Sequence, residues 1–114
     1  MWRNDAESVA DRALPIFQNY KGSSVALSRS TLCSKLLCRD RELRAAVREL
    51  RCQGHLIVAD QDGGYRFAQS PKEVYGYTAS LKSRIRALRE VVEAMEEEAQ
   101  HEWGEPVEQL GLAL

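Results

Sequence analysis

Cysteine and long apolar runs are scarce in this chain, and each scarcity argues against a class of protein. Three cysteines, Cys33, Cys38 and Cys52, cannot all pair within one chain and form no dense disulfide framework. No run of about 18 apolar residues occurs, so no transmembrane helix and no membrane partner are predicted. The first residues lack the apolar stretch of a signal peptide. These absences predict a cytoplasmic protein.

Residue sets that perform catalysis or hold a metal ion are also missing. The three cysteines and His55 have the spacing C-x4-C followed by C-x2-H, which lacks the paired C-x2-C motifs typical of zinc sites. His55 and His101 are isolated, and no serine motif, acidic metal cluster or phosphate-binding loop accompanies them. The sequence therefore predicts a protein that is not an enzyme and that uses no metal or cofactor.

Length and charge favour one basic domain with an attached acidic element. The chain has 114 residues, of which 44% are hydrophobic, enough for one small core. Its net charge of −1 hides an asymmetry. Residues 1–89 hold all 16 Lys and Arg against 9 acidic residues, a balance of +7, whereas residues 90–114 hold 8 Glu and no basic residue. A basic body of this kind favours an anionic partner.

The order of predicted elements is three helices, a hairpin and a long helix. Apolar spacing predicts helices over 5–20, 29–37 and 40–53, and strands over 56–59 and 65–68. Pro15 either kinks the first helix or lies in the first turn of a shorter one that begins near Leu14. Ser28 or Ser30 caps the second helix, and the third begins at Asp40. Residues 25–27 form at most a minor strand.

The final helix is predicted to begin at the Ser-Pro-Lys-Glu segment, residues 70–73, and to last to about Trp103. The predicted fold class is mainly α with a small β-hairpin: a domain over 1–70, a dimerisation helix over 71–103, and a tail over 104–114 for which mobility is expected.

The element order resembles winged helix-turn-helix domains of bacterial and phage regulators. The resemblance rests on the segment from Asp40 to Leu50, the Gly-His-Leu-Ile segment over 54–57, and the Gly-Gly-Tyr segment over 63–65, and it covers about residues 12–70. The N-terminal domain of the biotin-ligase repressor is one example of the winged-helix domains that this element order resembles. The resemblance implies a recognition helix at 40–53 and a wing at 56–68. Arg39 departs from the pattern, because many such proteins have a capping serine or threonine there.

Independently of this resemblance, the third helix is predicted to present a basic stripe. With Leu43, Val47 and Leu50 turned inward, four arginines spaced 3, 4 and 3 lie on the outward side: Arg41, Arg44, Arg48 and Arg51. Arginine can contact phosphate or the major-groove edge of guanine, and the small Ala45 permits close approach. The alternative interpretation is a solvated helix face whose arginines pair with glutamates. Three more residues are candidates for phosphate contacts: Arg29, Lys35 and Arg66.

The long helix carries an apolar stripe with heptad spacing. Its a positions are Thr78, Ile85, Val92 and Ala99, and its d positions are Leu81, Leu88 and Met95. The stripe could pack on the chain's own domain, as part of it is expected to do near Val74 and Tyr77. A helix of thirty residues spans about 45 Å, which exceeds what so small a domain can cover. The remainder predicts a homodimer.

Two directions of pairing compete. Branched residues at a with leucine at d favour a parallel pair, which would set Arg84 against Arg89 of the second copy. Antiparallel pairing centred on position 90 stacks Leu88 on Val92, Ile85 on Met95 and Leu81 on Ala99. It also pairs Lys82 with Glu96 and Arg84 with Glu98 of the second copy. Packing and charge together favour the antiparallel direction.

The sequence thus predicts a dimeric protein that binds double-stranded DNA, either a transcription regulator or a phage-type replication or recombination accessory. Two alternatives remain. One is an oligomeric assembly protein such as a small-terminase-like DNA-packaging adaptor. The other is a winged helix used only for contact with a protein.

Overall fold

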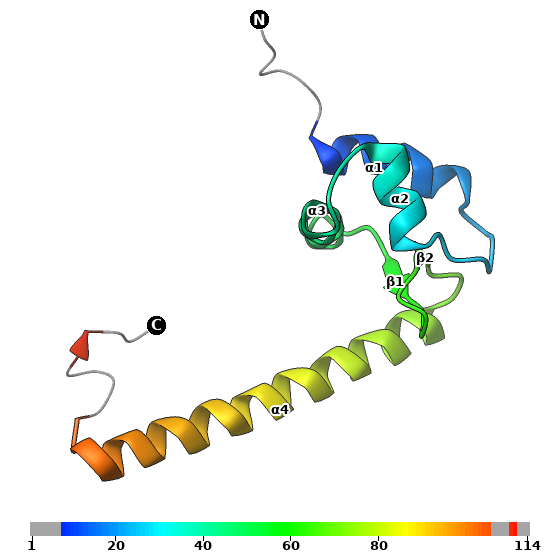
Figure 1. Ribbon diagram of the computed structural model, residues 1–114. Coiled ribbons are helices and arrows are strands. Elements are labelled where there is room, and N and C mark those ends of the chain that lie inside the picture. The colour runs from blue at the N-terminus through cyan, green and yellow to red at the C-terminus, as the bar shows by residue number, and fades with distance from the viewer. Residues whose placement is uncertain (1–7, 106–109, 112–114) are drawn as a thin grey trace, which may run out of the picture. The chain divides into compact units, whose positions relative to one another are not determined.

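The protein is mainly helical, with a small antiparallel hairpin and a long C-terminal helix. The computed structural model describes residues 8–105 and 110–111. Its elements are α1 (Val9–Asn19), α2 (Arg29–Leu36), α3 (Asp40–Cys52), β1 (Ile57–Ala59), β2 (Tyr65–Phe67) and α4 (Pro71–Trp103), labelled in Figure 1. The chain divides into a compact unit that ends at Tyr77 and a second unit that begins at Thr78. The compact unit therefore includes the first two turns of α4, beyond the expected boundary at residue 70. Residues 5–7 of the first predicted helix, and most of the predicted tail, lie outside the described residues.

Helix α1 begins at Val9 because Ser8 caps it. The Ser8 hydroxyl accepts a hydrogen bond from the Asp11 N–H at 3.1 Å, and the Ser8 N–H donates to the Asp11 carboxylate at 3.4 Å. Pro15 lies inside the helix on its exposed side. The alternative of a shorter helix beginning near Leu14 is therefore wrong, and α1 continues through the proline.

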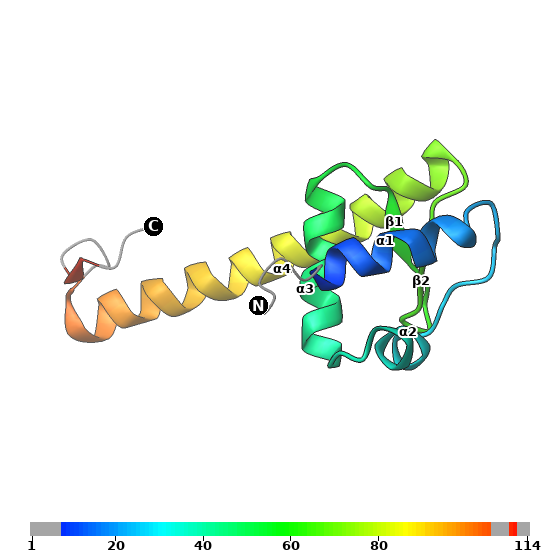
Figure 2. The ribbon, with the colours of Figure 1, turned by 90° about the horizontal axis from the view of Figure 1, so that it is seen from above.

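Three helices and the hairpin share one hydrophobic core. Helix α1 lies across α3, with α2 beside them (Figure 2). Phe17 of α1 and Phe67 of β2 meet edge to face, with ring centroids 6.2 Å apart. The buried apolar residues are Ala10, Ala13, Phe17, Leu32, Leu36, Leu43, Ala46, Val47, Leu50, Ile57, Val58, Tyr65 and Phe67. Within each of the three helices the buried residues are spaced 1, 3 or 4 apart, so one face of each helix packs in this core.

The turn between α2 and α3 is tight. Ser28 caps α2 by accepting from the Thr31 N–H at 3.1 Å, and α2 ends where Leu37 adopts the left-handed conformation with φ 50°. Leu37 is 90% exposed. Arg12 of α1 donates to the Leu36 carbonyl oxygen at 2.9 Å and so ties α1 to this turn.

The hairpin extends to a third segment of chain. Strands β1 and β2 pair in the register Ile57 with Phe67 and Ala59 with Tyr65. Leu27 forms a bridge with Tyr65 through two backbone hydrogen bonds of 2.8 and 2.9 Å. A side chain at Gly64 would approach the Ala26 side chain and the Leu27 carbonyl oxygen to 3.0 Å, so a larger residue would crowd this close pairing. The short segment at 25–27 thus contributes one bridging residue.

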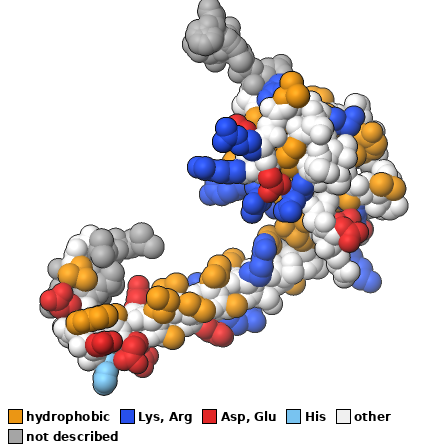
Figure 3. All heavy atoms as spheres, in the orientation of Figure 1, with side chains coloured by type: hydrophobic (Ala, Val, Ile, Leu, Met, Phe, Trp, Pro, Cys, Tyr) orange, Lys and Arg blue, Asp and Glu red, His pale blue; other side chains and the backbone are white. Residues whose placement is uncertain are grey.

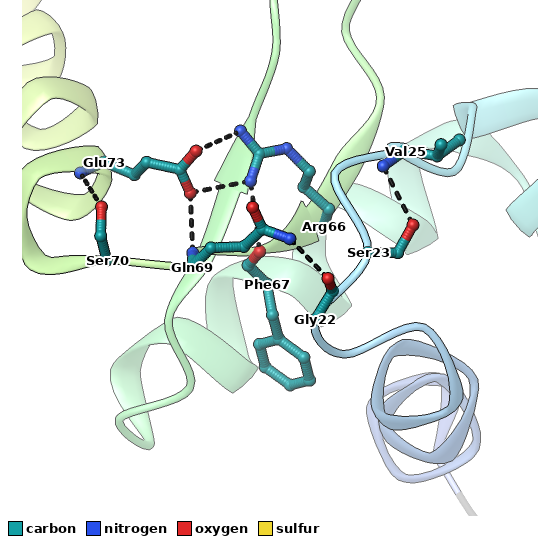
Figure 4. A network of polar contacts seen from close by, with 8 residues as sticks. All are labelled: Gly22, Ser23, Val25, Arg66, Phe67, Gln69, Ser70 and Glu73. Atoms are coloured by element: carbon teal, nitrogen blue, oxygen red, sulfur yellow. Dashed lines mark hydrogen bonds and ion pairs between the residues drawn. The ribbon is translucent and has the colours of Figure 1, made fainter.

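Within the compact unit, a polar network holds the beginning of α4 against the hairpin and the loop that follows α1 (Figure 4). Arg66 of β2 makes a bidentate ion pair with Glu73, at 2.9 and 3.0 Å. Glu73 also accepts from the Gln69 N–H at 2.7 Å, while Ser70 caps the helix at the Glu73 N–H. Gln69 in turn donates to the Gly22 carbonyl oxygen at 2.6 Å. The hydrogen bond from Arg66, with the one from Gln69, lowers the pKa of Glu73 from 4.5 to about 2.

Helix α4 carries many charged side chains along its length. Among the described residues, none of the helices combines the length and the apolar character needed to cross a membrane.

Candidate nucleic-acid interface

The outward face of α3 carries an arginine cluster. Leu43, Ala46, Val47 and Leu50 are buried, which leaves the opposite face in solvent. That face exposes the side chains of Arg41, Arg44, Ala45 and Arg48. Figure 3 shows Lys and Arg side chains gathered around α3. We call Arg41, Arg44 and Arg48 the arginine triad.

One carboxylate organises part of this face. Asp40, in the first turn of α3, accepts from Arg44 Nε at 3.0 Å and lies 3.4 Å from Arg29 Nε. Its side chain is 39% exposed, so both pairs are solvated and each contributes little to stability. Asp40 therefore holds Arg29 and Arg44 close together across the turn between α2 and α3.

The other members of the arginine triad are not engaged in this way. Among the described residues, neither Arg41 nor Arg48 has an ion-pair partner. Arg39, at the N-cap of α3, is also exposed, and its N–H donates to the Glu42 carboxylate at 2.9 Å. Arg39 thus adds a cationic side chain at the start of α3, which its departure from the usual capping residue did not indicate.

Arg51 does not lie on the outward face of α3, contrary to the prediction from its spacing. Its side chain is half-buried, with Nε donating to the Ile57 carbonyl oxygen at 2.8 Å. Its guanidinium lies 5.7 Å from the ring centroid of Tyr65 and 4.8 Å from that of Tyr77. The Nη2 atom is buried without a hydrogen-bond partner among the described residues. Arg51 thus joins α3, the hairpin and the beginning of α4.

The three candidate phosphate contacts are placed differently from one another. Lys35 and Arg29 are exposed on α2, and Arg29 faces Asp40. The Arg66 side chain is only 16% exposed and is committed to Glu73, which raises its pKa. Arg66 is therefore a structural residue of the hairpin in this conformation, unlike the free surface cation expected from the sequence.

The three cysteines lie in α2, in the turn after α2 and at the end of α3. Cys33 and Cys38 are half-buried near the turn between α2 and α3, and Cys52 is exposed. Burial, and then the neighbouring Cys33, raise the pKa of the Cys38 thiol. Within the described part of the chain, no group of three or more potential ligands is arranged to hold a metal ion.

The apolar stripe of α4 is largely exposed in the single chain. Thr78, Leu81 and Ala99 are half-buried, whereas Ile85, Leu88, Val92 and Met95 are between 50 and 67% exposed. Val91, at heptad position g, is exposed to 55% and widens the stripe beyond the a and d positions. Figure 3 shows apolar side chains along this helix, with acidic ones near its end.

Comparison of the chain with protein-family models, with curated proteins and with solved structures gives no match.

Proposed function

We propose that the protein binds double-stranded DNA through a winged-helix domain, with α3 as the recognition helix and the hairpin as the wing. The observation that carries the proposal is the arginine triad on the solvent face of a helix whose other face is fixed in the core. A rigid helix of this kind suits insertion into the major groove, which is wide enough to admit it.

Arginine chemistry supports this choice of partner. Arg41, Arg44 and Arg48 follow one another at spacings of 3 and 4, so they form a single row along α3. The guanidinium fork can pair with phosphate or with the O6/N7 edge of guanine, and Ala45 leaves room for the groove edge. Arg29 and Lys35 on α2 would then position the backbone.

The proposal includes a homodimer formed through α4. Exposed branched and long apolar side chains at heptad positions favour burial against a second copy. The antiparallel direction centred on position 90 is preferred, because it sets Lys82 beside Glu96 and Arg84 beside Glu98 of the second copy. Two DNA-binding units in one dimer are the arrangement of many regulators.

Replacing Arg44 and Arg48 with alanine tests the DNA-binding function. We expect the double variant to bind duplex more weakly, by about 1–3 kcal/mol for each of the two arginines that reads a base, measured by fluorescence anisotropy at low salt. Both side chains are exposed, so the melting temperature should change little. The parent protein should lose affinity steeply as salt rises, because phosphate neutralisation releases counterions.

Two further variants sharpen this test. The control variant Lys72→Ala with Arg86→Ala also removes two positive charges, but from exposed positions of α4. It should keep most of the duplex affinity of the parent. Asp40→Asn removes the carboxylate between Arg29 and Arg44, and should strengthen duplex binding a few-fold by relieving repulsion of phosphate. Equal binding by the parent and the Arg44/Arg48 variant would show that α3 is not the DNA-reading element. An arginine-dependent interaction with an acidic protein but not with duplex would support the protein-contact alternative.

A further inference from the structure

An apolar groove lies where the hairpin meets the beginning of α4. It has a volume of about 520 Å³ and is lined mainly by Leu56, Ala68, Pro71, Val74 and Tyr75. Leu56 is 56% exposed and Tyr75 is 71% exposed, so the lining presents apolar and aromatic surface to solvent. A groove of this size and character can receive a large aromatic side chain.

Trp103 is the most conspicuous apolar side chain at the other end of α4. It is 70% exposed, although tryptophan is usually well covered in folded proteins. Trp103 and Tyr75 are 28 residues apart and share heptad position e. At 1.5 Å per residue they are separated by about 42 Å along the same helix. A continuous helix α4 therefore keeps Trp103 apart from Tyr75 of its own chain.

We propose that Trp103 of one chain inserts into the groove at Leu56, Val74 and Tyr75 of a second copy. This inference rests on the antiparallel dimer of the proposed function and deepens it. In that direction e positions face e positions, and the register that pairs Lys82 with Glu96 also pairs Tyr75 with Trp103, one heptad further out. The charge complementarity of the inner pairs thus fixes the outer aromatic pair.

The groove extends the interface beyond α4. Leu56 and Ala68 flank the hairpin strands, whereas Pro71, Val74 and Tyr75 belong to α4. The indole of the second copy would therefore contact the compact unit as well as the dimerisation helix. A parallel dimer offers no such contact, because there Trp103 faces Glu98 of the second copy. Only the antiparallel direction therefore brings Trp103 of one chain to the groove of the second copy.

Fluorescence of the full chain tests the contact. In a Trp2→Phe background Trp103 is the only tryptophan. We expect blue-shifted emission and protection from acrylamide at concentrations where sedimentation shows a dimer. Adding Leu56→Asp should shift the emission to the red, and Leu88→Asp should give a monomer with exposed indole. Trp103→Ala should raise the dimer dissociation constant by about tenfold or more, as is usual for buried interface tryptophans, whereas Glu97→Ala at the outward position f should not.

Cysteine crosslinking distinguishes a failure of the Trp103 contact from a failure of the proposed dimer. In a Cys52→Ser background, chains with Tyr75→Cys should form a disulfide with tagged chains carrying Trp103→Cys, but not with chains carrying Glu97→Cys. A dimer whose Trp103 emission is that of exposed indole, and which gives no 75–103 crosslink, would overturn this contact and leave the proposed dimer standing. A monomer at all concentrations would overturn both. Protected emission in a monomer would mean that another part of the same chain covers Trp103, and would overturn the proposal as well.

Discussion

Arg48 and Arg51 lie three residues apart on α3 and are expected to have different roles. The Arg48 side chain is exposed, whereas Arg51 reaches the Ile57 carbonyl oxygen and lies over the rings of Tyr65 and Tyr77. Arginine is thus a solvent-exposed surface residue at position 48, whereas at position 51 it contacts other elements of the fold. Any loss of DNA binding on mutation of Arg51 would therefore need to be separated from a loss of stability.

Glu73 links the capping of α4 to the pH dependence of stability. Its pKa is lowered to about 2 by Arg66 and the Gln69 N–H, whereas the unfolded chain has the ordinary value near 4.5. A lowered folded-state pKa contributes stability that is fully present above pH 4.5 and is lost as pH falls towards 2. Glu73→Gln should lower the melting temperature at pH 7 and flatten its dependence on pH between about 5 and 2. Thermal unfolding followed by circular dichroism measures both effects.

A matched variant isolates the contribution of Glu73. Glu90→Gln removes one carboxylate from an exposed position of the same helix, for which no hydrogen-bond partner is found among the described residues. It should leave the acid branch of the stability profile as in the parent. If Glu73→Gln has the same pH profile as the parent, the pairing with Arg66 contributes nothing in solution.

At the scale of the element, α4 combines two patterns along one helix. Apart from Thr78, the a and d positions over 78–99 are apolar, and Val91 adds an apolar side chain near the centre of the helix. Basic residues come early in the helix and glutamates late, so an antiparallel pair places opposite charges side by side. Arg89 would face an arginine of the second copy in either direction of pairing, and therefore does not discriminate between the parallel and the antiparallel dimer.

Changing Leu88 to aspartate should convert the proposed dimer to a monomer. Leu88 is 66% exposed in the single chain, so the substitution costs little in the monomer. In the dimer it would bury an uncompensated charge in the apolar centre of the interface. Sedimentation equilibrium measures the change. An unchanged dimer mass would mean that α4 does not join the chains. A parent mass well above that of a dimer would favour the alternative of an oligomeric assembly protein.

A charge-reversal cycle then decides the direction of the pair. Glu96→Lys should weaken an antiparallel dimer by facing Lys82 of the second copy, and adding Lys82→Glu should restore it. In a parallel dimer position 82 faces Tyr77 and position 96 faces Val91, so no rescue is expected. Each exposed pair contributes only about 0.5 kcal/mol, so the cycle requires low salt. Absence of rescue there would favour the parallel direction.

At the scale of the whole molecule, dimerisation and DNA binding should reinforce each other. In the proposed dimer, two basic units joined through α4 would engage one long duplex together, which would raise the effective concentration of the second unit. The Leu88→Asp monomer should therefore bind a long duplex more weakly than the parent. On a duplex too short for two units, the parent and the variant should bind alike. Anisotropy titrations on the two lengths measure this, and equal affinities on the long duplex would argue that a single unit binds alone.

Local pattern was sufficient to predict the elements. Periodicity, a capping serine at position 28 or 30 and the Ser-Pro-Lys-Glu cap at 70–73 predicted the helices to within a few residues, because these signals act between neighbours in the chain. The structure assigns the cap of α2 to Ser28. The hairpin followed from two short apolar strands around Gly63 and Gly64. The heptad positions of α4 were likewise readable from spacing alone.

The packing of the elements determines which arginine side chains are exposed to a binding partner. Arg51 and Arg66 matched the basic pattern, yet the folded chain brings Arg51 to the hairpin and Arg66 to Glu73. The groove at Leu56, Val74 and Tyr75 likewise exists only because the hairpin returns to the beginning of α4. Sequence spacing reports which residues share the face of one element. Contacts between elements depend on how those elements pack, and spacing within a single helix carries no information about that.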